Sequence, residues 1–351
     1  MLNTDVRLIE MKSDKEVTIY DIAEALNISA STVSRGLRDH PSVRKVTKKK
    51  IMIVANKMGY QHNKFASNLR KKHTNMIGVV LPRLDSYFQS TIISGMEKEA
   101  NKAGYNLIIS QSQESIKKER ASILTMFNSR VDGLLVSLAY DTENLDHLDI
   151  FFKKKIPVIF FDRVYDQSEC TNIVIDNFKA GYDVTKHLIE QGCRRILHLG
   201  GNLLRNLYSD RFRGYKQALL DNGVPFDQDL VFIDRLNEEA GINTVKEILK
   251  MKIPPDGIFT VNDTTAATII CKLKEASIRV PDDIAVAGFN NDPISRVVDP
   301  NLTTINYPGE KMGEIAASTL IHKLKKLKTV NTNTIILHHE LIIRQSSLRK
   351  R

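Results

Sequence analysis

Cysteine is scarce in this sequence: three residues in 351, at Cys170, Cys193 and Cys271. They are odd in number, far apart and form no Cys-x-x-Cys pair, so the sequence predicts neither a disulfide framework nor a zinc site. No apolar run approaches the ~18–20 residues of a membrane span, and the N-terminus has no signal-peptide core. We therefore expect a cytoplasmic protein of a reducing compartment, with no membrane partner and no metal.

Signatures of common catalytic sites are also missing. The sequence contains no G-x-x-x-x-G-K-[ST], no G-x-S-x-G and no H-E-x-x-H, which are motifs of phosphate binding, of nucleophilic serine and of catalytic zinc. Gly200-Gly201 follows a predicted strand and is interpreted as a turn. These absences favour a binding protein over an enzyme, and we expect no cofactor.

Residues 17–62 carry the most informative pattern, that of two short helices at a tight turn followed by a third helix. Thr18 and Asp21 fit a capping box for the first helix. Asn27-Ile28-Ser29 is predicted to be the turn, with Ser29 capping the second helix. The third helix shows apolar residues at helical spacing and Gly59 as its C-cap. This arrangement predicts a helix-turn-helix unit.

The second helix is predicted to read the major groove of DNA. Val33 and Leu37 would face inward. The residues that would then point outward are Ala30, Ser31, Thr32, Ser34 and Arg35. Arginine can bind guanine O6 and N7 in bidentate fashion, and small hydroxyl side chains can read several base edges.

The charge distribution agrees with a nucleic-acid partner. The chain has 51 Lys+Arg and 41 Asp+Glu, a net charge of +10. Residues 1–75 hold 15 basic and 7 acidic residues, which gives +8, so 36 − 34 = +2 remains for residues 76–351. An excess of positive charge beside a helix-turn-helix indicates phosphate neutralisation and steep salt dependence.

After Lys72 the pattern changes to alternating strands and helices. The expected strands of the first half are 76–81, 105–110, 133–137 and 158–161, and the expected helices are 88–103, 115–129 and 144–154. The second half repeats the pattern with helices 180–191, 211–222, 240–250 and 264–276, and strands 195–199, 230–233, 257–261 and 284–289. Such alternation predicts parallel sheets covered by helices on both faces.

Two similar α/β halves are favoured over one large sheet. The sequence PDGIFTV near residue 257 repeats VDGLLVS near residue 133, and cores beyond ~250–300 residues tend to split. After residues 302–306, a helix at 309–327 and a strand at 334–337 could return the chain to the first half and create a hinge.

Taken together, these motifs resemble those of the lac repressor family of bacterial transcription regulators, over residues 17–346. In chain order they are T-I-Y-D-I-A, S-x-S-T-V-S-R, M-G-Y, N-x-x-A-x-x-L, D-G-L-L-V, G-Y-x-x-x-x-H-L-I-E-x-G, R-x-x-G-Y, V-N-D and L-T-T-I. The resemblance implies an all-α DNA-binding domain, a two-lobed α/β core like that of periplasmic binding proteins, a homodimer, and a small-molecule effector that controls DNA binding.

The resemblance also assigns DNA contacts residue by residue. Ala30, Ser31 and Arg35 match base-reading positions, although many members carry a larger polar residue where this chain has Ala30. Residues 63–72 match a hinge helix that folds on DNA, with Leu69 as the residue that wedges into the minor groove. The full set of DNA-binding positions is Thr18, Tyr20, Ala30, Ser31, Thr32, Ser34, Arg35, Tyr60, Asn63, Leu69 and Arg70.

The effector is expected between the lobes, at the carboxyl ends of the strands. The candidate residues there are Tyr87, Phe88, Asp162, Arg205, Arg211, Asn262 and Asn290. Aromatic rings can stack on a sugar or base, and Arg, Asn and Asp side chains can bind hydroxyl groups. Asp263 is interpreted as a helix cap. The family often has Asp where this chain has Asn290, so the ligand is left open; a sugar or sugar derivative is the leading expectation.

The expected organisation is a leader (1–16), a helix-turn-helix domain (17–62), a hinge helix and linker (63–75) and a core (76–351). Lobe 1 would comprise about 76–175 and 308–337, and lobe 2 about 176–307 and 338–351. The tail after Ile343 has no heptads, which favours a dimer over a tetramer. We expect a nucleoid-associated repressor with a pseudo-palindromic operator. The alternatives are a regulator tuned by a protein partner and an α/β enzyme that uses the core cleft.

Overall fold

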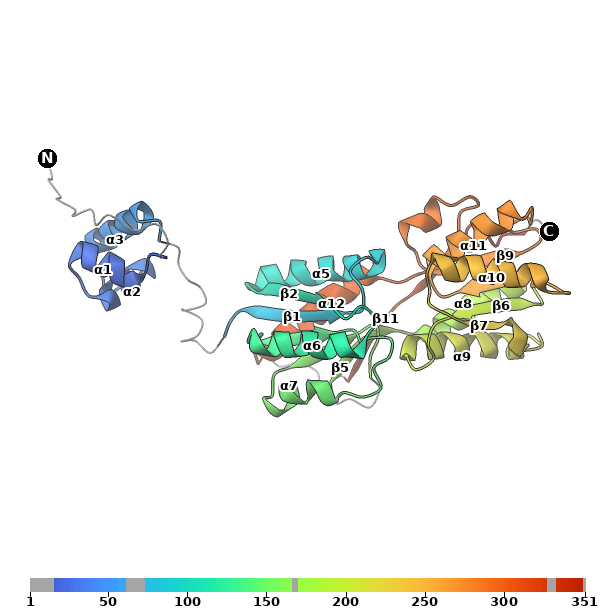
Figure 1. Ribbon diagram of the computed structural model, residues 1–351, viewed down its shortest axis with the longest axis horizontal. Helices are drawn as coiled ribbons and strands as arrows, with labels where there is room; N and C mark the ends of the chain where they lie inside the picture. Colours follow the sequence, from blue (N-terminus) through green and yellow to red (C-terminus); the bar gives the residue numbers. More distant parts are fainter. Residues whose placement is uncertain (1–15, 61–72, 166–169, 327–332, 350–351) are drawn as a thin grey trace. The chain divides into compact units, whose positions relative to one another are not determined.

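The structure of the protein is a computed structural model that describes residues 16–60, 73–165, 170–326 and 333–349. The chain divides into two compact units, residues 1–72 and residues 73–351, and each is described by itself. Figure 1 shows both units, with the first composed of helices and the second of sheets and helices.

The N-terminal unit contains three helices, α1 (Ile19–Leu26), α2 (Ala30–Leu37) and α3 (Lys45–Lys57). The predicted capping box is confirmed, because Thr18 and Asp21 cap α1 reciprocally. Asn27 adopts a left-handed conformation, with φ of 51°, and ends α1. Ser29 caps α2 by accepting a hydrogen bond from the Thr32 amide at 3.2 Å. Local sequence thus sets the turn between the two helices.

These helices enclose a small apolar core. Ile22, Val33 and Ile51 are fully buried, one from each helix. Met58 is the C-cap of α3, so the prediction that Gly59 is the cap is wrong by one residue. Gly59 follows with φ of +71°, a conformation that glycine adopts without strain. The unit is therefore held together by its own packing.

The first sheet of the larger unit is parallel throughout, in the order β11-β5-β4-β3-β1-β2. Its strands are β1 (Met76–Leu81), β2 (Asn106–Gln111), β3 (Gly133–Val136), β4 (Val158–Phe161), β5 (Thr171–Ile175) and β11 (Thr334–Leu337). Its helices are α5 (Tyr87–Ala103), α6 (Ile116–Asn128), α7 (Asp149–Lys153) and α12 (Gly309–Leu324). We call this part lobe 1.

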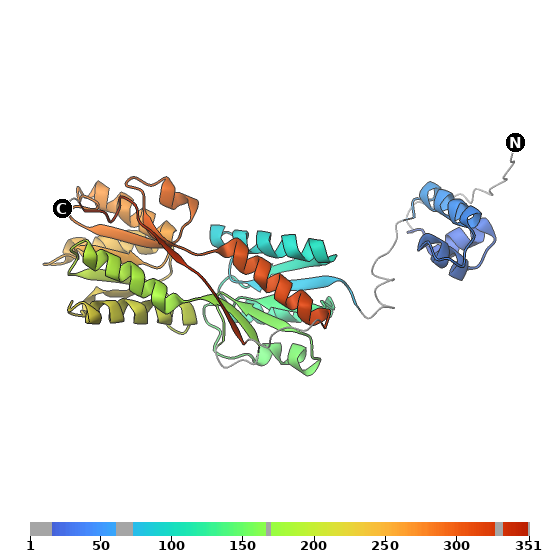
Figure 2. The ribbon, with the colours of Figure 1, turned by 180° about the vertical axis from the view of Figure 1, so that it is seen from behind.

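Alternating residues of each strand in lobe 1 serve opposite faces. Ile77 and Val79 of β1 belong to the apolar cluster that contains α5 and α12, whereas Val80 belongs to the cluster that contains α6 and α7. In Figures 1 and 2 the helices α5 and α12 cover one face of the sheet. Two covered faces explain why these strands are continuous apolar runs.

The second sheet has the order β12-β10-β9-β8-β6-β7, and it is parallel except for the antiparallel edge strand β12. Its strands are β6 (Ile196–Gly200), β7 (Val231–Ile233), β8 (Gly257–Thr260), β9 (Ala285–Asn290), β10 (Thr303–Asn306) and β12 (Glu340–Ile342). Its helices are α8 (Asn177–Glu190), α9 (Asn206–Asp221), α10 (Glu238–Lys250) and α11 (Asp263–Glu275). We call this part lobe 2.

The chain passes between the two sheets after β5, after β10 and after β11. The first apolar cluster also continues from lobe 1 into lobe 2, since it includes Ile77 of β1 and Phe259 of β8. The return of the chain to the first sheet, which periodicity left open, is thus observed. Among the described residues, no helix is both long and apolar enough to cross a membrane.

Most predicted elements are present, but some predictions were wrong. The strands β5 and β12 were not predicted. The helix expected at 144–154 is a 3-10 turn (Asp146–Leu148) followed by the short α7. The helix expected at 211–222 begins at Asn206, which moves Arg211 from the helix start to its interior.

In each lobe a pair of neighbouring helices approaches through glycine. In lobe 1, a Cβ atom on Gly313 of α12 would overlap the carbonyl oxygen of Ile92 in α5. In lobe 2, a Cβ atom on Gly214 of α9 would overlap the carbonyl oxygen of Phe178 in α8. Contact between helix backbones leaves no room for adjustment, so each pair is expected to move as a rigid block.

Gly313→Ala is expected to lower the melting temperature, because the added methyl group must push α12 away from α5. Overpacking of this kind costs about 1–3 kcal/mol. Ser318→Ala in the same helix is the control, and it should leave the melting temperature nearly unchanged. An unchanged or raised melting temperature for Gly313→Ala in a thermal unfolding scan would contradict the close packing.

Candidate functional site

The start of α2 presents the side chains predicted to read bases. Ser31 and Arg35 are exposed, and Ala30, Thr32 and Ser34 are half-buried. The Ser29 hydroxyl lies 2.9 Å from the hydroxyl of Ser31 and 2.8 Å from that of Thr32. Both hydroxyls therefore already have a partner, and Arg35 is the long polar side chain that extends from this face.

The remaining predicted DNA-binding positions differ in their surroundings. Tyr20 is 71% exposed at the first turn of α1. Thr18 is exposed, and its hydroxyl donates to Asp21 at 2.6 Å, so this side chain has a capping role. Tyr60 packs against the core of the unit, where burial raises its pKa. Asn63, Leu69 and Arg70 lie outside the described residues.

The third helix of the unit carries exposed basic residues. Lys45, Lys49 and Lys50 of α3 are exposed. Lys48 instead binds the Asp39 carboxylate at 2.6 Å, and that lysine lowers the pKa of Asp39. Exposed lysines without such a partner are suited to neutralising phosphates.

In the larger unit, Asp162 directly follows β4 and lies buried near lobe 2. Its carboxylate accepts a hydrogen bond from the Tyr307 hydroxyl at 2.8 Å and one from Gln89 at 3.4 Å. Burial raises its pKa, against the opposing effect of Arg163 and the Tyr307 hydrogen bond. The site thus places a carboxylate at the carboxyl end of a parallel strand, where α/β proteins bind ligands.

Arg211 of α9 approaches the same place from lobe 2. It is 2% exposed, and its guanidinium lies 3.5 Å from the centre of the Phe289 ring. Its Nε donates to Asn177 at 2.9 Å and its Nη1 to the carbonyl of Val261 at 3.2 Å. Burial lowers its pKa. Arg211 was predicted to bind a ligand, and in the structure its side chain is already hydrogen-bonded to Asn177 and to the carbonyl of Val261.

Phe88 also lies at this centre. Its ring stacks on Tyr307, with 4.2 Å between ring centres, and the residue is 6% exposed. The structure therefore brings three of the predicted effector residues, Phe88, Asp162 and Arg211, around Tyr307. Sequence reasoning missed Tyr307, which follows β10 on a segment that joins the lobes.

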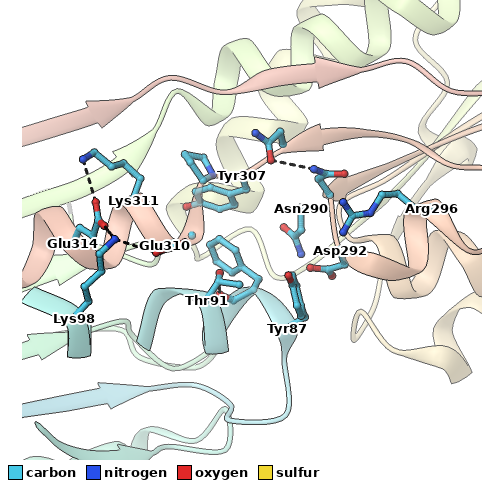
Figure 3. Close-up of a pocket in the computed structure, with 15 residues that line it drawn as sticks. Tyr87, Thr91, Lys98, Asn290, Asp292, Arg296, Tyr307, Glu310, Lys311 and Glu314 are labelled. Carbon is cyan, nitrogen blue, oxygen red and sulfur yellow. Dashed lines mark hydrogen bonds and ion pairs between the residues drawn. The ribbon is translucent and has the colours of Figure 1, made fainter. Parts of the chain in front are cut away.

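A cavity of about 570 Å³ opens beside this centre, between α5, the start of α12 and the residues that follow β9. Figure 3 shows Tyr87 of lobe 1 close to Asn290 and Asp292 of lobe 2 in its lining. Tyr87 is 51% exposed, and Asn290 has a positive φ of 107°. Of the predicted residues, Tyr87, Phe88 and Asn290 line this cavity.

Asp292 is a cavity residue that sequence reasoning missed. It is 8% exposed, and its Oδ1 atom has no hydrogen-bond partner among the described residues. Burial raises its pKa to about 6, against a smaller effect of the hydrogen bond from Asn290. The pattern Asn-Asn-Asp after a buried strand was the available signal, but only its first residue was selected.

The prediction that Asp263 caps α11 is wrong, because Asn262 is the cap. Asn262 is the cap of α11, since its side chain accepts from the Thr265 amide at 2.8 Å, and it lines neither cavity described here. Asp263 is not the cap. It is fully buried, and it accepts hydrogen bonds from the Thr304 hydroxyl at 2.7 Å and the Asp292 amide at 2.8 Å.

Arg205 lies at a second, smaller cavity of about 310 Å³ near the start of α9. Around it the lobes are joined by hydrogen bonds. Arg205 donates to the carbonyl of Thr142, Asn202 to that of Tyr140 at 3.1 Å, and Asn206 to that of Asp162 at 3.3 Å. Hydrogen bonds thus join the two lobes along this side.

No cluster of three or more His, Cys, Asp or Glu side chains suited to a metal ion occurs in the described part of the chain.

Comparison with known families shows which proteins this chain is similar to. Residues 18–63 match the model of bacterial regulatory proteins of the lacI family, and residues 185–347 match a periplasmic binding protein-like domain. The repressor PurR of Photorhabdus laumondii is 31% identical over 94% of this chain and 96% of its own length. Catabolite control protein A of Priestia megaterium is 29% identical over 94% of this chain and 99% of its own.

Solved structures share the fold. The lac repressor dimer bound to operator and the anti-inducer ONPF has a TM-score of 0.85 at 23% identity, covering 95% of this chain and 100% of that one. The regulator CelR in complex with cellobiose has a TM-score of 0.71 at 23% identity, covering 94% of this chain and 100% of that one.

This chain belongs to the lacI family of bacterial regulatory proteins. It is a DNA-binding transcription regulator with a two-lobed, periplasmic-binding-protein-like core.

Asp292→Asn is expected to remove part of the pH dependence of stability. The pKa of Asp292 is raised from 3.8 to about 6. Between these values the folded protein holds a proton that the unfolded chain has released, so the free energy of unfolding falls as pH rises. Relative to the wild type, the free energy of unfolding of Asp292→Asn should therefore rise between about pH 4 and pH 6, by at most about 3 kcal/mol.

The measurement is urea unfolding at several pH values. Asp229→Asn, at an exposed carboxylate in the same lobe, is the control and should follow the wild type. A constant difference between wild type and Asp292→Asn across this pH range would contradict the burial of a titrating carboxylate at the cavity.

Proposed function

We propose that the protein is a repressor that binds a pseudo-palindromic operator as a homodimer. The observation that carries this proposal is the exposed start of α2, with Arg35 projecting from a unit that packs on its own core. A two-fold dimer would place two such helices about one helical turn of DNA apart. Tyr20, Ser31 and the exposed lysines of α3 would add contacts to bases and phosphates.

We infer further that a small molecule bound between the lobes controls DNA binding. The support is the 570 Å³ cavity beside the buried centre of Asp162, Arg211 and Tyr307. Its wall offers amide and carboxylate groups from Asn290 and Asp292 and an exposed ring from Tyr87, which suit the hydroxyl groups and face of a sugar or sugar derivative. The effector would have to bind one lobe arrangement more tightly than the other to shift DNA binding.

We propose a regulatory and not a catalytic role for the core, in a cytoplasmic, nucleoid-associated protein. The named relatives are transcription regulators, which supports this view. A regulator tuned by a protein partner is the second candidate, because the groups at the centre of the cleft already have partners within the chain.

Arg35→Ala is expected to relax base choice at one position in each half-site, because a bidentate arginine–guanine contact contributes about 1–3 kcal/mol of discrimination. Selection of binding sites from a random DNA library, followed by sequencing, measures this. Arg213→Ala, an exposed arginine of the core, is the matched control and should select the wild-type site. A selected site that Arg35→Ala leaves unchanged would rule out base reading by this residue.

A thermal-shift screen against sugars, sugar phosphates, uronic acids and nucleobases is expected to yield a stabilising ligand. A ligand at 100 times its Kd that binds only the folded state adds ~2.7 kcal/mol. Asn290→Ala should weaken that ligand tenfold or more, since loss of a buried hydrogen bond costs about 1–3 kcal/mol. Asn222→Ala, exposed on lobe 2, is the control.

Two results would count against the cleft as the effector site. A hit that binds Asn290→Ala as tightly as the wild type would place the effector elsewhere on the protein. Absence of any hit, with DNA binding intact, would favour a protein partner in place of a small molecule.

A further inference from the structure

Basic residues gather at one edge of lobe 1, the edge at which the chain enters the lobe. Because the sheet is parallel, each helix that leads from one strand to the next ends where the next strand begins. Figures 1 and 2 show the ends of α5 and α12 and the start of β1 at the same end of the lobe. We call this edge the entry edge, and its described segments are 73–75, 102–105, 129–132, 153–157 and 322–326.

The entry edge is strongly positive, although the core as a whole is nearly neutral. Its segments contain eight Lys or Arg residues and one acidic residue, Asp132, which gives +7. Residues 76–351 carry +2 in total, so the rest of the core carries −5. Two of the cations, Lys102 and Lys153, form ion pairs with neighbouring carboxylates. The cations of the edge that are exposed and have no ion pair among the described residues are Arg130, Lys154, Lys155, Lys325 and Lys326.

Three of these cations occupy backbone positions that favour glycine. Arg130, Lys155 and Lys326 each directly follow the C-cap residue of a helix, with φ of 54°, 55° and 51°. A side chain in this left-handed conformation is unfavourable, and glycine is the usual residue there. A cation at a helix end does interact favourably with the helix dipole, but the ends of α7 and α12 carry three lysines each. This excess indicates a role beyond holding the helix ends.

The segment through which the chain enters lobe 1 is fixed to this edge. The Asp132 carboxylate accepts hydrogen bonds from the amides of Thr74 and Asn75, each at 2.8 Å. The Thr74 hydroxyl donates to the carbonyl of Arg130 at 2.8 Å. In the sequence, residues 61–72 link this segment to the helices of the DNA-binding unit. The entry edge is thus the part of the core that follows the DNA-binding unit most directly along the chain.

We propose that the entry edge is a second DNA-contacting surface, which binds phosphates of the duplex that flanks the operator. Its charge is complementary to DNA, which carries one negative charge per ~1.7 Å of helix axis. Contacts to phosphates carry no sequence information, so the edge adds affinity and salt dependence and leaves base choice to α2. The inference rests on the proposed operator-binding function and goes beyond it, because it assigns part of the DNA contact to the core.

The test measures binding of the full chain to two duplexes by fluorescence anisotropy over a range of KCl concentrations. Both duplexes contain the site that the wild type selects from a random library, and one is extended on each side by about 20 base pairs, roughly two helical turns. The wild type should bind the extended duplex at least about tenfold more tightly at low salt. Its plot of log affinity against log salt should also be steeper by about 2 or more on that duplex, because each neutralised phosphate adds ~0.9 to the slope.

The variant that tests the edge replaces its five unpaired cations with glutamine, and it should lose both the gain in affinity and the steeper slope. Its substitutions are Arg130→Gln, Lys154→Gln, Lys155→Gln, Lys325→Gln and Lys326→Gln. The matched control removes the same charge from exposed basic residues elsewhere on the core, and it should behave as the wild type. Its substitutions are Lys117→Gln, Arg120→Gln, Arg235→Gln, Lys246→Gln and Lys252→Gln.

A second variant separates DNA binding from the stability of the helix ends. Arg130→Gly, Lys155→Gly and Lys326→Gly together remove three cations and place glycine where the backbone is left-handed. The melting temperature of this triple variant should therefore not fall. The triple variant should still lose most of the gain in affinity on the extended duplex.

The proposal is overturned if the glutamine variant of the edge keeps the affinity gain and the slope of its control, or if the wild type binds both duplexes alike. A lower melting temperature of that variant with unchanged DNA binding would also overturn it, and would assign these cations to the helix ends or to an acidic protein surface. If selection yields no preferred site, the proposed operator-binding function fails, and this proposal fails with it.

Discussion

Hydrogen bonds between buried polar groups join the two lobes of the core. Asp162 of lobe 1 depends on the hydroxyl of Tyr307, which lies on a segment between the lobes. Arg163 of lobe 1 donates to the Tyr208 hydroxyl of lobe 2 at 3.1 Å. Separating the lobes would break these hydrogen bonds, and Arg163 and Asp162 would keep only their partners within lobe 1, Glu114 and Gln89; the angle between the lobes is therefore tied to a small set of hydrogen bonds.

The hydrogen bonds between the lobes connect two parts that are each tightly packed. Gly313 and Gly214 let the helix pairs of lobe 1 and lobe 2 touch backbone to backbone, so neither lobe can absorb a change at the interface by internal rearrangement. The side near α9 carries several lobe-to-lobe hydrogen bonds, whereas the side near α5 contains the larger cavity.

The sequence predicted what is determined locally. The caps of α1 and α2 follow from the side chains of Thr18, Asp21 and Ser29, each of which acts on its own helix end. Continuous apolar runs identified most of the parallel strands, because both faces of each sheet are covered. The strand β5 was missed, since its residues Thr171 and Asn172 interrupt the apolar run although both are buried.

The site was less predictable because its residues are brought together only where the chain passes between the two lobes. Tyr307 and Asp162 are 145 residues apart in sequence, and nothing in the neighbourhood of either residue indicates the other. Asn290, Asn291 and Asp292 all line the cavity, and the sequence does not show that Asp292 is the buried one of the three. The cap of α11 was assigned to Asp263 and not to Asn262, because two neighbouring residues that can both cap a helix follow the same strand.

In the DNA-binding unit, the start of α2 offers few side chains for base recognition. The hydroxyls of Ser31 and Thr32 are already bound to Ser29, so each can offer only its remaining capacity to a base. Ala30 offers only apolar contact, for example to a thymine methyl group. Under the proposed function, Arg35 would be the main source of directional base recognition from α2, and the exposed lysines would supply affinity that does not depend on sequence. A regulator built in this way needs both half-sites, and hence a second copy of the chain, to distinguish its operator from other DNA.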